Sequence, residues 1–137
     1  MLRVNGILET ALYVKDVERS KVFYESLFGW TVMDSDSRIC AFNVRDGQVF
    51  LLFKKGGTLR SVSLPGGIIP GHDGSGQSHA AFAIPASDWD AWKARLEERG
   101  IPLEATMNWP RGGKSLYFRD PDGHLLELAT PGIWANY

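Results

Sequence analysis

Three side chains able to bind a metal ion lie in segments with the alternating pattern of β-strands. Successive side chains of a strand point to opposite faces, so every second residue shares a face. In each segment that face carries one candidate ligand and otherwise mainly alanine, which suggests open space rather than a packed interior. The three faces are Glu9 with Ala11 and Tyr13, His79 with Ala81 and Ala83, and Glu127 with Leu125 and Ala129.

Glu9, His79 and Glu127 would offer one ion two carboxylates and one imidazole. Oxygen ligands together with nitrogen favour Mn²⁺, Fe²⁺, Ni²⁺, Zn²⁺ or Mg²⁺ over thiophilic ions. Three protein ligands leave coordination positions open for water or substrate, as a catalytic metal site requires. The alternative is that each residue is an isolated surface group or a hydrogen-bonded filler, the usual role of a single Glu or His in a strand.

The first half of the chain reads as a strand, a helix and three strands. Asp16 is placed to cap the helix, and Gly29 supplies the left-handed residue that ends it. Turn residues separate the strands that follow. The predicted elements are a strand over Ile7–Val14, a helix over Val17–Phe28, and strands over Trp30–Met33, Ile39–Val44 and Val49–Phe53.

The second half repeats this order. Ser87 with Asp90 is a plausible capping pair for the helix, and Gly100 ends it. The turn from Asp120 to His124 joins the last two strands. The predicted strands are His79–Ile84, Leu103–Trp109, Ser115–Arg119 and Leu125–Ala129, and the helix carries Trp89, Trp92 and Leu96 on one face.

Local similarity supports a duplication, because Asp46–Leu51 parallels Asp122–Glu127 and places Leu51 opposite Glu127. The sequence therefore predicts an α+β fold of two βαβββ modules, at about 7–54 and 78–130, within one domain. Side by side, they would curve a mixed sheet into an open barrel with its helices outside. The segment at about 55–77, rich in Gly, Pro and Ser, reads as a long loop or linker.

Composition excludes several classes of protein. The chain has 137 residues and a net charge of −1, with Lys and Arg scattered, so no nucleic-acid-binding or membrane-binding surface is expected. No signal peptide and no apolar run long enough for a membrane span are evident. The single Cys40 rules out an internal disulfide and fits a reducing compartment, so a cytoplasmic location is expected.

These segments carry a resemblance to a known superfamily. The chain resembles the vicinal oxygen chelate proteins: glyoxalase I, bleomycin-resistance and fosfomycin-resistance proteins, extradiol dioxygenases and methylmalonyl-CoA epimerase. The resemblance spans nearly the whole chain. It rests on Glu9–Val17 with Phe23–Tyr24 and Leu27–Gly29, on His79–Ile84, and on Tyr117–Leu128.

The resemblance implies that the first, fifth and last strands each donate a metal ligand, at Glu9, His79 and Glu127. Two departures are visible: many members have His or Gln at the place of Glu9, and glyoxalase I has a further ligand at the place of Leu51. The glutathione-dependent glyoxalase reaction is therefore in doubt. The run Ser115–His124 is similar to that of fosfomycin-resistance proteins.

The expected function is a metal-dependent enzyme that chelates a small oxygenated substrate, with lyase, transferase or dioxygenase chemistry. A displaced Glu9 carboxylate or a bound water could act as base, and Tyr117 could place its hydroxyl near the substrate, although packing in the core is an equal alternative. Arg111, Lys114 and Ser115 are candidate substrate-binding residues, although the two cations could equally be solvated turn charges. The alternative is a metal-free protein that binds a drug or metabolite, and in either case a homodimer is expected.

Overall fold

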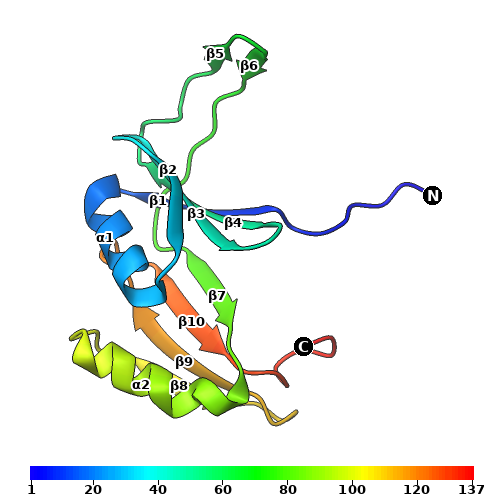
Figure 1. The fold of residues 1–137 in the computed structure, drawn as a ribbon, viewed down its shortest axis with the longest axis vertical. Helices are drawn as coiled ribbons and strands as arrows, with labels where there is room; N and C mark the ends of the chain where they lie inside the picture. Colours follow the sequence, from blue (N-terminus) through cyan, green and yellow to red (C-terminus); the bar gives the residue numbers. More distant parts are fainter. The chain divides into compact units, whose positions relative to one another are not determined.

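Each half of the chain folds into a four-stranded mixed sheet with one α-helix (Figure 1). The computed structural model describes residues 1–137 as two compact units, Met1–Gly76 and Gln77–Tyr137. In the first unit, the elements are β1 (Glu9–Val14), α1 (Val17–Phe28), β2 (Thr31–Ser35), β3 (Ile39–Arg45) and β4 (Gln48–Lys54). In the second they are β7 (His79–Ala83), the 3₁₀ turn η1 (Ala86–Asp88), α2 (Trp89–Glu98), β8 (Ala105–Asn108), β9 (Lys114–Arg119) and β10 (Leu125–Ala129).

The two sheets have the same topology. The strand orders are β1-β4-β3-β2 and β7-β10-β9-β8, and in each sheet only the first pair is parallel. The α+β class and the two βαβββ modules predicted from the sequence are confirmed.

The register of the parallel pairs also repeats. Ala11 is aligned with Leu51 between β1 and β4, and Ala81 is aligned with Glu127 between β7 and β10. Leu51 and Glu127 are thus equivalent positions of the two modules, as the local sequence similarity predicts.

The first helix is capped as predicted. The Asp16 carboxylate accepts the N–H of Arg19 at 3.0 Å, and Gly29 ends the helix with a φ of 70°. The capping pair predicted for the second helix is wrong. A 3₁₀ turn precedes α2, so Asp88 becomes its N-cap without a side-chain bond to the helix, and the Ser87 hydroxyl donates to the Asp88 carboxylate at 3.0 Å.

The linker is more ordered than the sequence predicts. It contains a short antiparallel hairpin of β5 (Val62–Leu64) and β6 (Gly67–Ile69), seen in Figure 1. Pro65 and Gly66 form its turn. A hairpin with only three aligned residue pairs is too short to show an alternating pattern in the sequence. The Gly and Pro residues of this segment indicate a loop instead.

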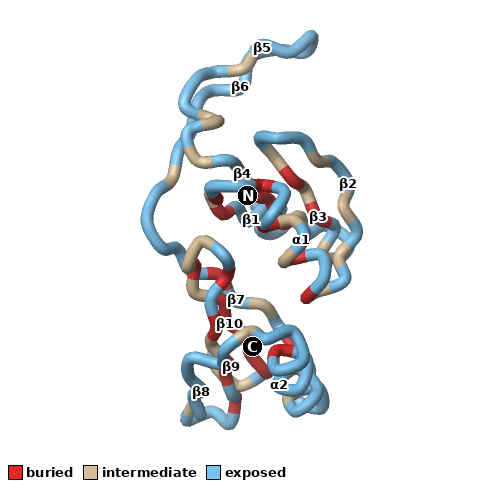
Figure 2. Tube along the Cα trace, turned by 90° about the vertical axis from the view of Figure 1, so that its left-hand side faces the viewer, coloured by how far each residue is buried: buried red, intermediate tan, exposed pale blue.

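Most buried apolar residues lie in the strands and helices of the two units, as the burial colouring of Figure 2 shows. In the first unit the core is aromatic: Tyr24 packs on Phe42 and Phe50, with ring centroids 6.3 and 5.0 Å away. In the second, Leu96 of α2 and the apolar residues of β9 and β10 are buried. None of the helices is both long and apolar enough to cross a membrane.

Candidate metal site

His79 and Glu127 face each other on neighbouring parallel strands of the second unit. His79 begins β7 and is aligned with Leu125 of β10, two residues before Glu127 on the same face. Nε2 of His79 lies 3.2 Å from Oε2 of Glu127. The Glu127 side chain is 7% exposed and the imidazole 50% exposed, so the pair opens to solvent on the His79 side.

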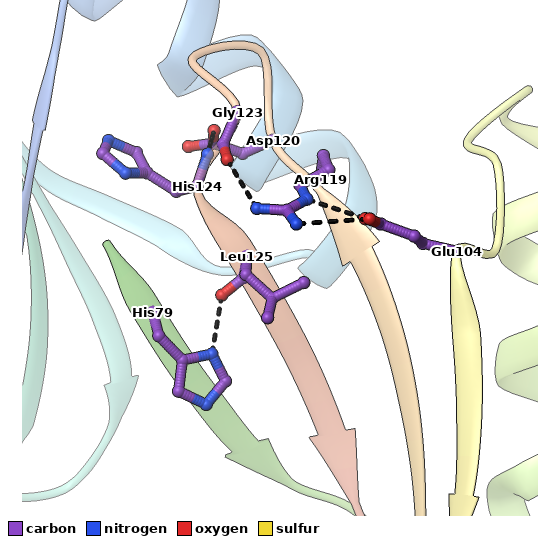
Figure 3. Close-up of polar contacts among 7 residues, drawn as sticks. All are labelled: His79, Glu104, Arg119, Asp120, Gly123, His124 and Leu125. Carbon is purple, nitrogen blue, oxygen red and sulfur yellow. Dashed lines mark hydrogen bonds and ion pairs between the residues drawn. The ribbon is translucent and has the colours of Figure 1, made fainter. Parts of the chain in front are cut away.

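A backbone hydrogen bond fixes the tautomer of the imidazole. Nδ1 of His79 lies 2.9 Å from the carbonyl oxygen of Leu125 (Figure 3). A carbonyl only accepts, so Nδ1 must carry the proton, and in the neutral ring Nε2 presents a lone pair. Metal-binding histidines are typically held in this way by an N–H bond on the far side of the ring.

Two hydroxyl groups hold the other end of the pair. Both Ser115 and Tyr117 of β9 donate to Oε1 of Glu127, Tyr117 at 3.1 Å. Ser115 in turn accepts the indole N–H of Trp109 at 2.8 Å. Because Oε1 is occupied, Oε2 is the oxygen left to face His79.

The phenol of Tyr117 is a donor throughout the neutral pH range. Burial, followed by the charge of the Glu127 carboxylate, raises the pKa of Tyr117 above its ordinary value. The group therefore keeps its proton and donates to Glu127.

These two residues fit a divalent cation. In the neutral tautomer an imidazole lone pair faces a carboxylate oxygen, and two acceptors at this distance need a positive group between or beside them. Nitrogen and oxygen donors suit the borderline and hard divalent ions named above. A proton shared by the pair would satisfy the same two atoms, so the geometry has two possible occupants.

The third predicted ligand belongs to the other unit. Glu9 is exposed and begins β1 in the first unit. It is aligned with Val49 of β4, just as His79 is aligned with Leu125 of β10, so Glu9 and His79 hold equivalent positions in the two modules. Neither unit alone brings three His, Cys, Asp or Glu side chains together as a metal site. Glu9 as a ligand stays a prediction.

The candidate substrate-binding residues fall into two groups. Ser115 is fully buried and Tyr117 partly buried, and both bind the Glu127 carboxylate. Lys114 is exposed, with its ammonium 5.5 Å from the ring centroid of Trp89, and Arg111 lies exposed in the preceding turn. A role for Arg111 and Lys114 with substrate stays a prediction.

The turn between β9 and β10 is a structural anchor. Asp120 accepts the backbone N–H groups of Asp122 and His124 at 2.9 and 2.8 Å, and Nδ1 of the buried His124 accepts that of Ser78 at 2.9 Å. Arg119 pairs with Glu104 at 2.7 Å and donates to the Gly123 carbonyl (Figure 3). Since Ser78 precedes His79, the His124 bond aligns the start of β7 with β10.

The role of Trp109 does not follow from the sequence. Its indole reaches Ser115 because the chain turns back between β8 and β9, where the N–H of Trp109 bonds the Gly113 carbonyl at 2.8 Å. Nothing in the local sequence distinguishes this indole from a core or wall residue.

Comparison with known proteins agrees with this architecture. The family model of the Glyoxalase/Bleomycin resistance protein/Dioxygenase superfamily matches residues 6–128, so the chain belongs to this superfamily. A solved structure, that of lactoylglutathione lyase from Agrobacterium tumefaciens, is 32% identical, with a TM-score of 0.86 over 96% of this chain and 98% of that one.

Two relatives with assigned names indicate which kind of enzyme in the superfamily the chain is similar to. Metallothiol transferase FosB of Shouchella clausii is 33% identical over 93% of this chain and 81% of its own length. Glutathione transferase FosA of Serratia marcescens is 28% identical over 91% of this chain and 80% of its own length. The chain is an enzyme of the glyoxalase-like type, as the sequence predicts.

Proposed function

We propose that this chain is a metal-dependent enzyme that transfers a low-molecular-weight thiol to a small oxygenated compound, or removes one from it. The divalent ion would be held by His79 and Glu127, with Glu9 as the third ligand. In a transfer, an S–C bond forms as a C–O bond breaks, and the thiol proton goes to the released oxygen.

The observation that carries the proposal is the short distance of 3.2 Å between Nε2 of His79 and Oε2 of Glu127, two atoms able to bind a metal. Both groups are held from behind, His79 by a backbone carbonyl and Glu127 by Ser115 and Tyr117. Such second-layer hydrogen bonds orient metal ligands, and the bond that His79 donates to a carbonyl also raises the basicity of its imidazole. A divalent ion bound there would act as a Lewis acid and stabilise negative charge developing on a substrate oxygen.

Other residues of the site would position the ligands, leave room for the substrate and accept a proton. Ser115, Tyr117 and Trp109 keep the Glu127 carboxylate in one orientation, which makes them positioning residues. The alanines Ala81 and Ala83 beside His79 are exposed and small, so they leave space for a substrate. Glu9 is exposed, and a carboxylate released from a cation could accept a proton as base.

The names of the relatives support a thiol as one reactant. Metallothiol transferase, glutathione transferase and lactoylglutathione lyase each name a thiol or a thioester of one. This favours transferase or lyase chemistry over the dioxygenase chemistry that the sequence also allows. Leu51 cannot bind a metal and is buried at the place of the further ligand of glyoxalase I, so the proposed set has three protein ligands.

Metal content tests the first part of the proposal. We expect about one equivalent of Mn²⁺, Ni²⁺ or Zn²⁺ to bind the purified protein at equilibrium dialysis, with loss of binding in His79→Ala and Glu127→Gln and weaker binding in Glu9→Gln. Glu104→Gln is the matched control, since Glu104 pairs with Arg119 outside the site. Equal metal content in all five proteins would refute the proposal.

Thiol consumption tests the second part. We expect the metal-loaded protein to consume glutathione in the presence of fosfomycin, with activity abolished by chelation and by Glu127→Gln. Chelator-resistant binding of these compounds without turnover would instead support the metal-free binding protein. A cytoplasmic location and a homodimer complete the proposal; fractionation and sedimentation test them.

A further inference from the structure

The buried histidine of the turn between β9 and β10 holds the residue that precedes the proposed ligand His79. His124 is 1% exposed, and its Nδ1 accepts the backbone N–H of Ser78 at 2.9 Å. The carbonyl of Ser78 accepts the N–H of Leu125, also at 2.9 Å. Both backbone groups of Ser78 are therefore bound by neighbouring residues of one segment, and the chain enters β7 from a fixed position.

The same segment supplies the carbonyl that orients the imidazole of His79. Leu125, whose carbonyl oxygen lies 2.9 Å from Nδ1 of His79, directly follows His124 in the chain. His124 thus fixes both partners of that bond. Its side chain holds the start of β7, and its backbone leads into the residue that carries the acceptor.

The turn itself is held at several points. The Asp120 carboxylate accepts the N–H of His124 at 2.8 Å, and the N–H of Asp120 donates to the His124 carbonyl at 3.1 Å. Gly123 has a φ of 82°, and a Cβ atom there would come within 2.7 Å of Nε2 of Gln77. The turn therefore packs directly against the segment that leads into β7, and the His124 ring has little freedom to follow a displaced strand.

The two histidines of this unit hold opposite tautomers in their neutral forms. Nδ1 of His124 accepts a backbone N–H, so its ring proton lies on Nε2. His79 carries its proton on Nδ1 and presents a lone pair at Nε2. Without the acceptor of His124, no side chain of the turn would hold the N–H of Ser78, and the imidazole of His79 could leave its carbonyl.

The first module lacks this side-chain contact. It repeats the backbone pairing at the start of its parallel strands, where the N–H of Val49 donates to the Leu8 carbonyl at 2.8 Å. Gln48 takes the place of His124, is exposed and forms no hydrogen bond with the backbone of Leu8. Since the strand pairing forms without an imidazole there, the presence of one only beside His79 points to a task in orienting that ligand.

We propose that His124 is a positioning residue for the metal site: through the backbone of Ser78, its Nδ1 keeps His79 in the tautomer and orientation that present Nε2 to the ion. The inference deepens the proposed function and rests on it, because it takes His79 as a metal ligand. Groups directly behind metal ligands contribute about 10- to 100-fold to metal affinity. His124 acts through one further residue, so we expect a contribution of about tenfold.

Metal titration of matched variants tests this role. His124→Leu should weaken Mn²⁺ binding about tenfold, whereas His124→Asn, of nearly the same shape but with an amide oxygen at the place of Nδ1, should keep most of the affinity. If His124→Leu does not fold, His124→Gln, which moves the acceptor by one bond, should show the same loss. Leu96→Val, a change in the buried face of α2, controls for lost stability. Wild-type affinity in His124→Leu or His124→Gln, or an equal loss in Leu96→Val, would overturn the assignment.

Ring ¹⁵N signals of the metal-free protein separate this inference from the proposed function. At alkaline pH, where the imidazole is neutral, His79 should show one tautomer, protonated at Nδ1, in the wild type and in His124→Asn, and both tautomers in His124→Leu. If the wild type binds no metal but this change is seen, the positioning of His79 by His124 stands and its role as a metal ligand falls. A single tautomer in His124→Leu, or a mixture in the wild type, would overturn the inference itself.

Discussion

Leu51 occupies in the first module the position that Glu127 occupies in the second. Each lies in an inner strand of its sheet, β4 or β10, and is aligned with an alanine of the neighbouring parallel strand, Ala11 or Ala81. The residues opposite them on the antiparallel neighbour also differ. Leu51 of β4 is aligned with Ala41 of β3, which has no hydroxyl, whereas Glu127 of β10 is aligned with the hydroxyl donor Tyr117 of β9. The carboxylate and its donors thus form a set that only the second module has.

A carboxylate placed at Leu51 should therefore destabilise the protein. Leu51→Glu would bury a charge with no hydroxyl donors beside it, at a cost of about 2 kcal/mol or more in the free energy of unfolding. Urea denaturation measures this. Leu51→Met, which keeps volume and polarity, should cost less than about 1.5 kcal/mol; an equal loss in both variants would count against the role of charge.

Removal of the Ser115 hydroxyl should weaken the site without touching a ligand. Ser115→Ala leaves the indole N–H of Trp109 without its acceptor and frees one side of Glu127. We expect a loss of about 1–3 kcal/mol in stability and a fall of roughly 10- to 100-fold in metal affinity. Calorimetric titration with Mn²⁺ measures the second effect, and full affinity in Ser115→Ala would contradict a positioning role.

The thiol of Cys40 should be unreactive in the folded protein. Cys40 is fully buried in β3, and burial raises the pKa of its thiol, so little thiolate forms at neutral pH. Labelling with a chromogenic disulfide reagent should be slow in buffer and immediate in urea. Rapid labelling under native conditions would show that the first unit opens readily.

The Glu104–Arg119 pair should make a pH-dependent contribution to stability. The Arg119 guanidinium lowers the pKa of Glu104 in the folded state. A depressed pKa means that the contribution is present above the unfolded pKa, about 4.3, and is lost as pH falls through the folded value. The stability difference between wild type and Glu104→Gln should thus shrink below about pH 4, whereas a constant difference would assign the effect to packing.

The fold could be predicted from the sequence because its signals are local. Asp16 and Gly29 mark both ends of α1, and alternation in Leu125–Ala129 sets which side chains share the Glu127 face. The sequence does not predict the start of α2, because a 3₁₀ turn shifts its cap to Asp88. The sequence does not predict the β5–β6 hairpin, because each strand has only three residues.

The candidate site is only partly predictable, because some of its contacts join residues far apart in the sequence. Strand alternation and the duplication bring His79 and Glu127 to one face. Hydrogen bonds between distant residues, such as Trp109 to Ser115 or Ser78 to His124, depend on how turns fold back and leave no periodic trace. The sequence predicts Ser115 and Tyr117 as substrate-binding residues but not their bonds to Glu127; contact of the two hydroxyls with a substrate stays a prediction.

X-ray absorption spectroscopy of the protein loaded with Mn²⁺ or Zn²⁺ tests most directly whether His79 and Glu127 hold a cation. We predict nitrogen and oxygen ligands at about 2.0–2.2 Å, with the outer-shell scattering of one imidazole per ion. That scattering should vanish in His79→Ala and persist in His72→Ala. A spectrum of the wild-type protein without imidazole scattering, or one unchanged by His79→Ala, would contradict the account.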